Sequence, residues 1–263
     1  MKINVYLPFK ETYSLNKASA VSITVNNNLV HSAYKNVIRI FGNFNENPMN
    51  IDEFVGVKKS LNIFKTKNKH IAEVMCKKIL NEDDQNQIIE IHNRPYIFNY
   101  VKKKLPQSKV CLFFHNNPKD MKGSFTIKQR IFILENASMI YCVSDYIKNE
   151  FLDGISKNYK NIQTLYNGVQ RSLNIKNIKN KDVLFVGRIV PEKGVHLFVK
   201  AISLISKDFP DWKFSLAGST RLGSSRNNRY ATKVINEFIK IGPQANYLGF
   251  LNQNQIKNKL TTA

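Results

Sequence analysis

Short β-rich runs alternate with helical patterns along the whole chain, and this alternation constrains the fold more than any other feature. Parallel strands need a long crossover connection, usually a helix, whereas antiparallel strands can be joined by a tight turn. Many of the runs are apolar throughout, as strands buried on both faces should be. The sequence therefore predicts an α/β protein whose parallel sheets are covered by helices.

The pattern is interrupted once, which divides the chain into two predicted domains. The first domain, residues 1–170, has expected strands at 3–7, 36–41, 88–91, 109–114, 139–143 and 163–166. Its helical patterns cover 15–31, 68–80, 96–104, 124–136 and 146–152. Residues 171–181 are polar, basic and unpatterned, so we interpret them as a linker.

The alternation restarts in the second predicted domain, residues 182–263. Its expected strands are 182–186, 213–217 and 246–250, and its helices cover 195–206, 228–241 and a segment from about 252. About 80 residues are too few for a doubly wound domain that covers both faces of its sheet. We therefore expect this domain to be incomplete and the sequence to be part of a longer protein.

The chain is strongly basic, with 40 Lys and Arg residues against 19 Asp and Glu residues and a formal net charge of +21. Such a charge predicts attraction to polyanions. The charge has two possible origins. One is a compositional bias toward Lys, Asn and Ile, and the other is a surface that binds anionic lipid, as in a peripheral membrane protein. Nothing shows the clustered basic face with aromatic residues that a nucleic-acid partner would need, so none is predicted.

Other features point to a cytoplasmic protein. The apolar runs are much shorter than the roughly 20 residues of a membrane-spanning helix, and Pro8, Lys10 and Glu11 end the first run before it could act as a signal peptide. The three cysteines are odd in number and widely spaced, so we expect reduced packing residues. No Cys/His spacing predicts a zinc site, and no nucleophile elbow is present.

The most informative stretch is 185–195, Phe-Val-Gly-Arg-Ile-Val-Pro-Glu-Lys-Gly-Val. A predicted strand ends at Gly187, and Arg188 and Lys193 flank a loop that leads into a helix. Two cations and free backbone N–H groups at the carboxyl end of a strand suit a diphosphate. The stretch is neither a P-loop nor a G-x-G-x-x-G motif. The alternative is a surface turn with two solvated cations.

Two histidines follow neighbouring predicted strands of the first domain. His92 comes after strand 88–91, and His115 comes after strand 109–114. Ligands of open α/β sheets collect at the carboxyl ends of the strands. A single histidine at such a position is more often structural, but two of them indicate a polar pocket at that edge. Ser144 or Asp145, after strand 139–143, is most simply a helix N-cap.

Taken together, several segments carry a resemblance to a known family. They are the strand end at His115 and the segments 143–146, 167–169 and 185–195, with 91–95 and 7–11. The chain resembles a retaining GT-B glycosyltransferase of family 4 along essentially its whole length. Segments 91–95 and 7–11 are particularly similar to bacterial members that build lipopolysaccharide, capsule and other surface glycans.

The resemblance implies a GT-B fold, with two Rossmann-like domains and the donor in the cleft between them. It also implies roles for individual residues. Arg188 and Lys193 would hold the donor diphosphate and, with His115 at the donor sugar or acceptor pocket, form the catalytic set. Gly187, Gly218 and the turn at Gly249 would line the nucleotide side. Ala18 and Ser19 stand where the family usually has paired glycines that approach the phosphates.

The implied activity is transfer of a hexose from a UDP- or GDP-linked donor to a glycan or lipid-linked acceptor, with retention of configuration, no metal and no other cofactor. Two glutamates eight positions apart, which the family uses for the donor sugar and ribose, would lie beyond Ala263. We therefore expect weak or no transfer if the protein ends there. The alternative is a catalytically impaired remnant or a nucleotide-sugar-binding module of the same fold.

Overall fold

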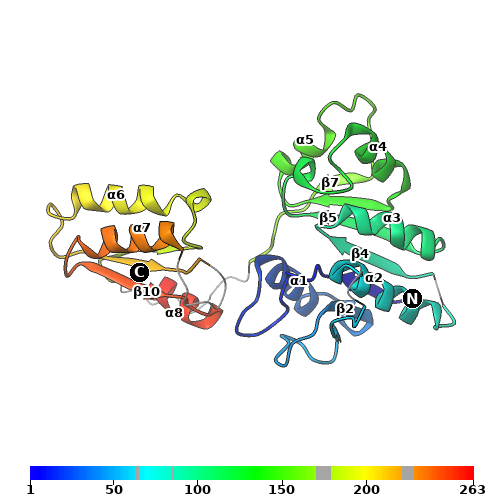
Figure 1. Ribbon diagram of the computed structural model, residues 1–263, viewed down its shortest axis with the longest axis horizontal. Helices are drawn as coiled ribbons and strands as arrows, with labels where there is room; N and C mark the ends of the chain where they lie inside the picture. The colour runs from blue at the N-terminus through cyan, green and yellow to red at the C-terminus, as the bar shows by residue number, and fades with distance from the viewer. Residues whose placement is uncertain (63–64, 85, 170–178, 221–227) are drawn as a thin grey trace. The chain divides into compact units, whose positions relative to one another are not determined.

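Strands pair in parallel in both sheets of the computed structural model (Figure 1). The structure describes residues 1–62, 65–84, 86–169, 179–220 and 228–263. The chain divides into two compact units, Met1–Gln170 and Arg171–Ala263. Both units are built from parallel strands and helices, so the predicted α/β class is confirmed. Most of the predicted linker 171–181 lies outside the described residues.

The described part of the first unit contains a sheet of seven parallel strands in the order β3-β2-β1-β4-β5-β6-β7. The strands are β1 (Ile3–Tyr6), β2 (Ile38–Asn43), β3 (Phe54–Val57), β4 (Ile88–His92), β5 (Lys109–Phe114), β6 (Met139–Cys142) and β7 (Ile162–Thr164). Strand order reverses between β1 and β4, which is the switch point where open α/β sheets leave a crevice at the carboxyl ends of their strands.

Helices cover the two faces of this sheet unequally. They are α1 (Ala20–Val30), α2 (Lys67–Leu80), α3 (Pro95–Lys104), α4 (Ile127–Asn136) and α5 (Asp145–Leu152), with short 3₁₀ turns η1 (Lys35–Val37) and η2 (Pro118–Asp120). On one face α1 packs Val25 and Leu29 against Val5 and Ile40. The other four helices share the main core on the opposite face, where alternate strand residues such as Ile91 point.

Local sequence sets where the helices begin. The hydroxyl of Ser144 accepts a hydrogen bond from the backbone N–H of Ile147 (3.3 Å), which confirms the predicted N-cap. Thr66 and Thr126 cap α2 and α4 in the same way. The predicted helix 15–31 is wrong at its start, because Tyr13 is buried, an isolated bridge holds Ser14, and α1 begins only after Ser19.

Strand β3 was not expected from the sequence. It is a four-residue strand at the edge of the sheet and contains Gly56, a residue that is depleted in strands. The strand is formed by its parallel pairing with β2, from Ile40 opposite Phe54 to Asn43 opposite Val57, and not by a strong local preference for β structure.

Within its described residues the second unit has a three-stranded parallel sheet in the order β10-β9-β8. The strands are β8 (Asp182–Val186), β9 (Lys213–Ala217) and β10 (Ala245–Gly249), and the helices are α6 (Val195–Ile205), α7 (Arg229–Ile239) and α8 (Gln253–Thr262), with η3 (Pro191–Lys193). Phe214 and Leu216 of the central strand pack against Val199 of α6 and Phe238 of α7. This is the second βαβαβ unit that the sequence predicts.

All three cysteines lie among the described residues of the first unit. Cys76, Cys111 and Cys142 are all free and buried, as predicted. Burial raises the pKa of the Cys76 thiol to about 12, so this side chain stays protonated and acts as an apolar packing residue. Among the helices that the structure describes, none combines the length and the apolar character of a membrane span.

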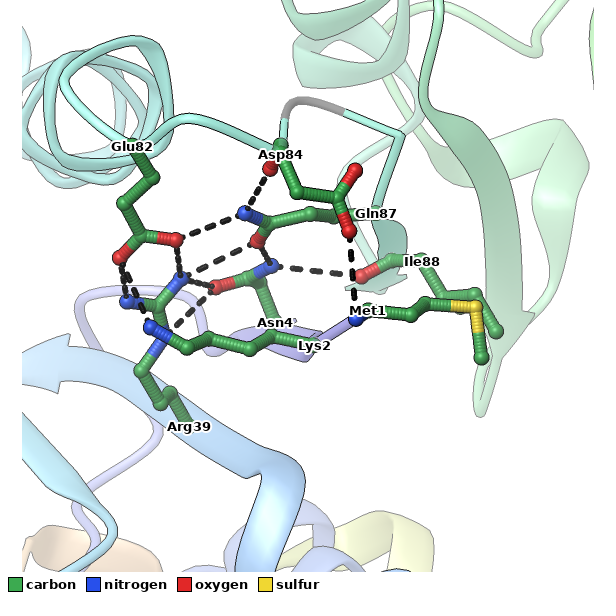
Figure 2. Close-up of polar contacts among 8 residues, drawn as sticks. All are labelled: Met1, Lys2, Asn4, Arg39, Glu82, Asp84, Gln87 and Ile88. Atoms are coloured by element: carbon green, nitrogen blue, oxygen red, sulfur yellow. Dashed lines mark hydrogen bonds and ion pairs between the residues drawn. The ribbon is translucent and has the colours of Figure 1, made fainter.

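A polar cluster closes the amino-terminal edge of the first sheet (Figure 2). Arg39 of β2 donates to Asn4 Oδ1 of β1 (2.6 and 3.0 Å), to Gln87 Oε1 (3.1 Å) and to both carboxylate oxygens of Glu82. Asn4 Nδ2 in turn donates to Gln87 Oε1 (2.6 Å). Asn4 and Gln87 are almost fully buried, so these bonds satisfy polar groups that would otherwise be costly to bury. The cluster therefore fastens β1 and β2 to the loop before β4.

Glu82 is the anionic member of the cluster. Partial burial alone would raise its pKa, but hydrogen bonds from Arg39, Gln87 and Lys2 outweigh that effect and lower the pKa to about 2. A carboxylate whose folded pKa lies below its unfolded value stabilises the fold at neutral pH. That stability is present above pH 4.5 and is lost as the pH falls toward 2.

We expect Arg39→Met to lower the free energy of unfolding by roughly 2 to 3 kcal/mol at pH 7, because it removes charge-assisted hydrogen bonds to partly buried acceptors. The difference from the wild type should shrink between pH 4.5 and 2, where Glu82 becomes protonated in the folded protein. Urea unfolding followed by circular dichroism measures both effects. The exposed Lys78→Met, at the end of α2, is the control, and an equal loss in that variant would contradict the assignment.

Candidate functional site

The two histidines that follow neighbouring strands meet at the carboxyl edge of the first sheet. His92 is the last residue of β4, and His115 directly follows β5. His92 Nδ1 lies 2.9 Å from His115 Nε2, which is a hydrogen bond between the two rings. The structure thus brings together the two side chains from which the sequence predicted a polar pocket.

Aromatic stacking fixes the ring of His92. It stacks on Phe113 with the centroids 4.6 Å apart, and Phe113 lies 4.7 Å from the ring of Tyr141 on the next strand. His92 is 1% exposed, and its Nε2 has no hydrogen-bond partner among the described residues. The carboxylate of Glu90 lies 3.8 Å from that nitrogen.

These contacts favour one assignment of protons to the ring nitrogens. A proton on His92 Nε2 faces the Glu90 carboxylate, whereas a lone pair there would be repelled by it. His92 Nδ1 is then the acceptor, and His115 Nε2–H donates to it. His115 is left with a free acceptor at Nδ1. Burial, together with the nearby His92, lowers the pKa of His115 to about 3, so the ring is neutral at physiological pH.

Asn93 holds the loop after β4 in place, a role that the sequence analysis did not assign. It is buried, and its φ of 50° is unusual for a residue other than glycine. Its Oδ1 accepts a hydrogen bond from the backbone N–H of His115 (2.8 Å), and its Nδ2 donates to Asn116 Oδ1 (3.0 Å). The Asn-Arg-Pro run after a strand was the available signal, since asparagine tolerates left-handed backbone.

Ala18 and Ser19 lie at the start of α1, also in the first unit. The Ser19 hydroxyl accepts from the backbone N–H of Ser22 (3.2 Å) and donates to Ser22 Oγ (2.9 Å). Because this hydroxyl already caps the helix, a ligand at this position would meet backbone and the small Ala18 side chain.

The second unit has a pocket of about 130 Å³ at the carboxyl ends of its strands, here called the second-unit pocket. Its lining residues are Val186, Gly187, Arg188, Ala217, Gly218, Ser219, Phe250, Leu251 and Ile256. Three of the predicted site residues, Gly187, Arg188 and Gly218, therefore share one pocket. Gly249 adjoins it, because its carbonyl accepts from the Gly218 N–H (2.7 Å).

Gly218 is required by the close approach of two chain segments. Its φ is 155°, and a Cβ built on it would lie 1.8 Å from the carbonyl oxygen of Gly187. The Gly187 N–H also donates to the carbonyl of Ala217 (3.0 Å). A side chain at position 218 would therefore force β8 and β9 apart at the pocket.

Arg188 and Lys193 are both exposed at this edge, and among the described residues neither has an acidic partner. The buried side chains of Ile189, which follows Arg188, and of Val195, two residues after Lys193, anchor the loop between β8 and α6. Lys193 ends η3 and is not a lining residue of the second-unit pocket. The pocket thus offers one unpaired guanidinium at its wall, with a second cation on the adjoining turn.

Metal binding has no evident site in the described part of the chain. No group of three or more His, Cys, Asp or Glu side chains there is placed to hold a metal ion.

Comparisons with known proteins agree with this architecture. Residues 141–263 match the family model described as Glycosyl transferases group 1. The putative glycosyltransferase YtcC of Bacillus subtilis is 29% identical over 163 residues, which are 55% of this chain and 40% of that protein. The uncharacterized glycosyltransferase MJ1178 of Methanocaldococcus jannaschii is 30% identical over 199 residues, which are 72% of this chain and 48% of that protein.

Solved structures show the same fold. The crystal structure of Anabaena Alr3699/HepE in complex with UDP and glucose is similar with a TM-score of 0.64 and 14% identity, covering 95% of this chain and 70% of that one. The present chain spans about half the length, or less, of the curated relatives that it matches. Together these findings show a GT-B-like fold and a match to the group 1 glycosyl transferase model over residues 141–263.

We expect Gly218→Ala to destabilise the second unit by roughly 3 kcal/mol or more, because the new Cβ meets the carbonyl of Gly187. The single tryptophan, Trp212, packs against the core of this unit and reports its unfolding by fluorescence. Gly242→Ala is the matched control, since Gly242 also has a positive φ but nothing within 4 Å of a built Cβ. It should cost about 1 to 2 kcal/mol, and equal losses would contradict the close-approach argument.

We expect the imidazole of His115 to titrate far below 6.5 in an NMR pH titration. His92→Phe keeps the stacking surface but removes the neighbouring imidazole, so the pKa of His115 should rise part of the way toward 6.5. Because the folded pKa is lowered, the contribution of His115 to stability is complete above pH 6.5 and is lost as the pH falls toward 3. His31→Phe, at an exposed position, should leave the titration unchanged; an unchanged titration in His92→Phe would refute the coupling.

Proposed function

We propose that this chain carries the donor-binding apparatus of a retaining glycosyltransferase of family 4, which transfers a hexose from a UDP- or GDP-linked donor to a glycan or lipid-linked acceptor. The observation that carries the proposal is the second-unit pocket, where an unpaired Arg188 stands beside glycine backbone at the carboxyl ends of parallel strands. That arrangement suits a nucleotide diphosphate. Support also comes from the group 1 family match and from the similar Anabaena structure, whose title reports UDP and glucose.

Positive charge is the chemical requirement of the reaction. When the bond between the anomeric carbon and the phosphate oxygen breaks, negative charge grows on the departing nucleoside diphosphate. Arg188 at the pocket and Lys193 on the adjoining turn would stabilise that charge, and no carboxylate among the described residues competes for either of them. We therefore expect transfer without a divalent metal ion and in the presence of a chelator.

In the first unit, His115 would contact the donor sugar or the acceptor. The neutral ring of His115 offers a hydrogen-bond acceptor at Nδ1. Its orientation is fixed by the hydrogen bond between His115 Nε2 and His92 Nδ1. A neutral acceptor suits a sugar hydroxyl, because the hydroxyl donates to it without a net charge being buried. Ala18 and Ser19 would allow the donor phosphates to approach the backbone at the start of α1.

The proposed location in the cell is based on the charge of the chain. A net charge of +21 would draw a cytoplasmic protein to the inner face of an anionic membrane, where lipid-linked acceptors lie. Surface-glycan synthesis, such as lipopolysaccharide or capsule formation in a bacterium, is the pathway class that this proposal favours. No role in nucleic-acid binding is proposed.

Binding of UDP and GDP, measured by calorimetry, tests the donor site. Arg188→Gln should weaken the binding of the preferred nucleotide by about tenfold or more, because it removes a charge-assisted contact of roughly 1.5 to 3 kcal/mol. Lys200→Gln, at an exposed position on α6 of the same unit, should leave it within about twofold, as expected for a surface charge away from the site. The absence of binding by either nucleotide would refute the proposal. Release of nucleotide on addition of a sugar donor and an acceptor distinguishes an enzyme from a binding module.

A further inference from the structure

The first unit contains a pocket that belongs neither to the proposed donor site nor to the histidine pair. It has a volume of about 150 Å³ and is called here the lysine pocket. Its lining residues are Phe9, Val57, Lys58, Lys59, Ser60, Asn62, Lys65, Lys67, His70 and Ile71. Four of these ten residues are lysines and none is acidic, so the pocket is a concentrated positive site.

Positive charge in this pocket is only partly neutralised. Lys65 pairs with Glu73 at 2.5 Å, and residues 54–72 contain four other lysines and no Asp or Glu. Lys58 lies over the ring of Phe44 (5.4 Å), and Lys67 lies over the ring of Phe9 (4.4 Å).

Among the described residues Lys59 has no ion pair or ring contact. Three of the lining lysines, Lys58, Lys59 and Lys67, therefore have no described carboxylate partner. Like charges at this proximity repel each other, and an anion in the pocket would relieve the repulsion.

Further groups around the pocket favour an anion. The pocket includes the first residue of α2, a 14-residue helix whose amino end carries partial positive charge. Nδ1 of His70, another lining residue, is buried and has no hydrogen-bond partner among the described residues. A protonated Nδ1 could donate to an anion.

The wall of the pocket is held by contacts outside it. Asn68 Oδ1 accepts from the backbone N–H of Phe9 (2.8 Å), and the Asn68 carbonyl accepts from the Tyr6 hydroxyl (3.1 Å). These bonds tie the loop after β1 to the start of α2. Lys67, at the start of α2, is thus presented from a fixed position, which lowers the entropic cost of binding.

The pocket also lies at the same edge of the sheet as the histidine pair. Val57 ends β3, Phe9 follows β1, and all strands of the sheet are parallel, so their carboxyl ends lie on one side. β1 pairs directly with β4, the strand that ends at His92. With strands about 4.8 Å apart, β1 lies roughly 10 Å from β5 and His115.

We propose that the lysine pocket binds a phosphate group of the acceptor substrate, so that the acceptor of this enzyme is a phosphorylated glycan or glycan lipid. The inference rests on the proposed glycosyltransferase function, and it assigns to the first unit a phosphate site separate from that for the donor diphosphate. The shared chemistry is a phosphate ester or diphosphate, held by Lys58, Lys59 and Lys67. The phosphate is carried either on a lipid or on a soluble sugar.

Calorimetric titration with inorganic pyrophosphate tests the site itself. The titration is made in an Arg188→Gln/Lys193→Gln background, which removes both cations of the proposed donor site. In that background Lys58→Gln/Lys59→Gln should weaken binding by about tenfold or more, because two ammonium contacts are lost. The matched control is Lys77→Gln/Lys78→Gln, which removes the same charge from exposed positions at the other end of α2 and should change binding less than about twofold. Circular dichroism confirms that each variant is folded.

Two results would overturn the proposal. One is the absence of pyrophosphate binding in the Arg188→Gln/Lys193→Gln background, and the other is equal weakening by both lysine pairs, which would indicate diffuse attraction. UDP binding by Lys58→Gln/Lys59→Gln in the otherwise native chain separates this test from that of the proposed function. It should remain unchanged if the donor site is independent of the lysine pocket.

Vesicle sedimentation distinguishes the two sources of phosphate. The vesicles contain phosphatidylcholine with an equal fraction of either phosphatidic acid, which exposes a phosphate monoester, or phosphatidylglycerol. Preference for phosphatidic acid that is lost in Lys58→Gln/Lys59→Gln supports a lipid-borne phosphate. Pocket-dependent pyrophosphate binding without such a preference supports a soluble phosphorylated acceptor.

Discussion

The parallel pairing of the strands is the constraint on which the rest of this structure depends. Parallel strands must all begin at one edge of a sheet and end at the other, so every loop that follows a strand meets its neighbours at the carboxyl edge. His92 and His115 are 23 positions apart in sequence and come within 2.9 Å for this reason. The same geometry places Gly187, Arg188 and Gly218 in one pocket of the second unit.

The polar groups at the two edges of the first sheet differ in whether they are already paired. At the amino edge, Arg39, Asn4, Glu82 and Gln87 satisfy one another (Figure 2), which leaves little for a ligand to bind. At the carboxyl edge, several lysines have no described carboxylate partner, and the neutral His115 has a free acceptor at Nδ1. A polar group that is already paired contributes to the fold, whereas one held in place by other contacts and left unpaired is available for chemistry.

The two proposed phosphate sites, one in each unit, differ in their chemistry. The second unit offers a guanidinium beside glycine backbone, which suits close approach by a diphosphate. The first unit offers lysines after strand β3 and at the start of α2, which suit a phosphate held by charge with less demand on geometry. An enzyme that joins a nucleotide-linked donor to an anionic acceptor would need both kinds of site, and each can be tested without the other.

The sequence by itself determined the α/β class, most strand and helix positions, the buried cysteines and the Ser144 cap, because these follow from local periodicity and hydrogen bonding. It missed the edge strand β3, the start of α1, the role of Asn93 and the lysine pocket. Lys58, Lys59 and Lys67 read as part of a general basic bias along the chain. Only the tertiary structure decided which of 40 basic residues share a cavity, since that depends on strand order and on the loops that bring β1, β3 and α2 together.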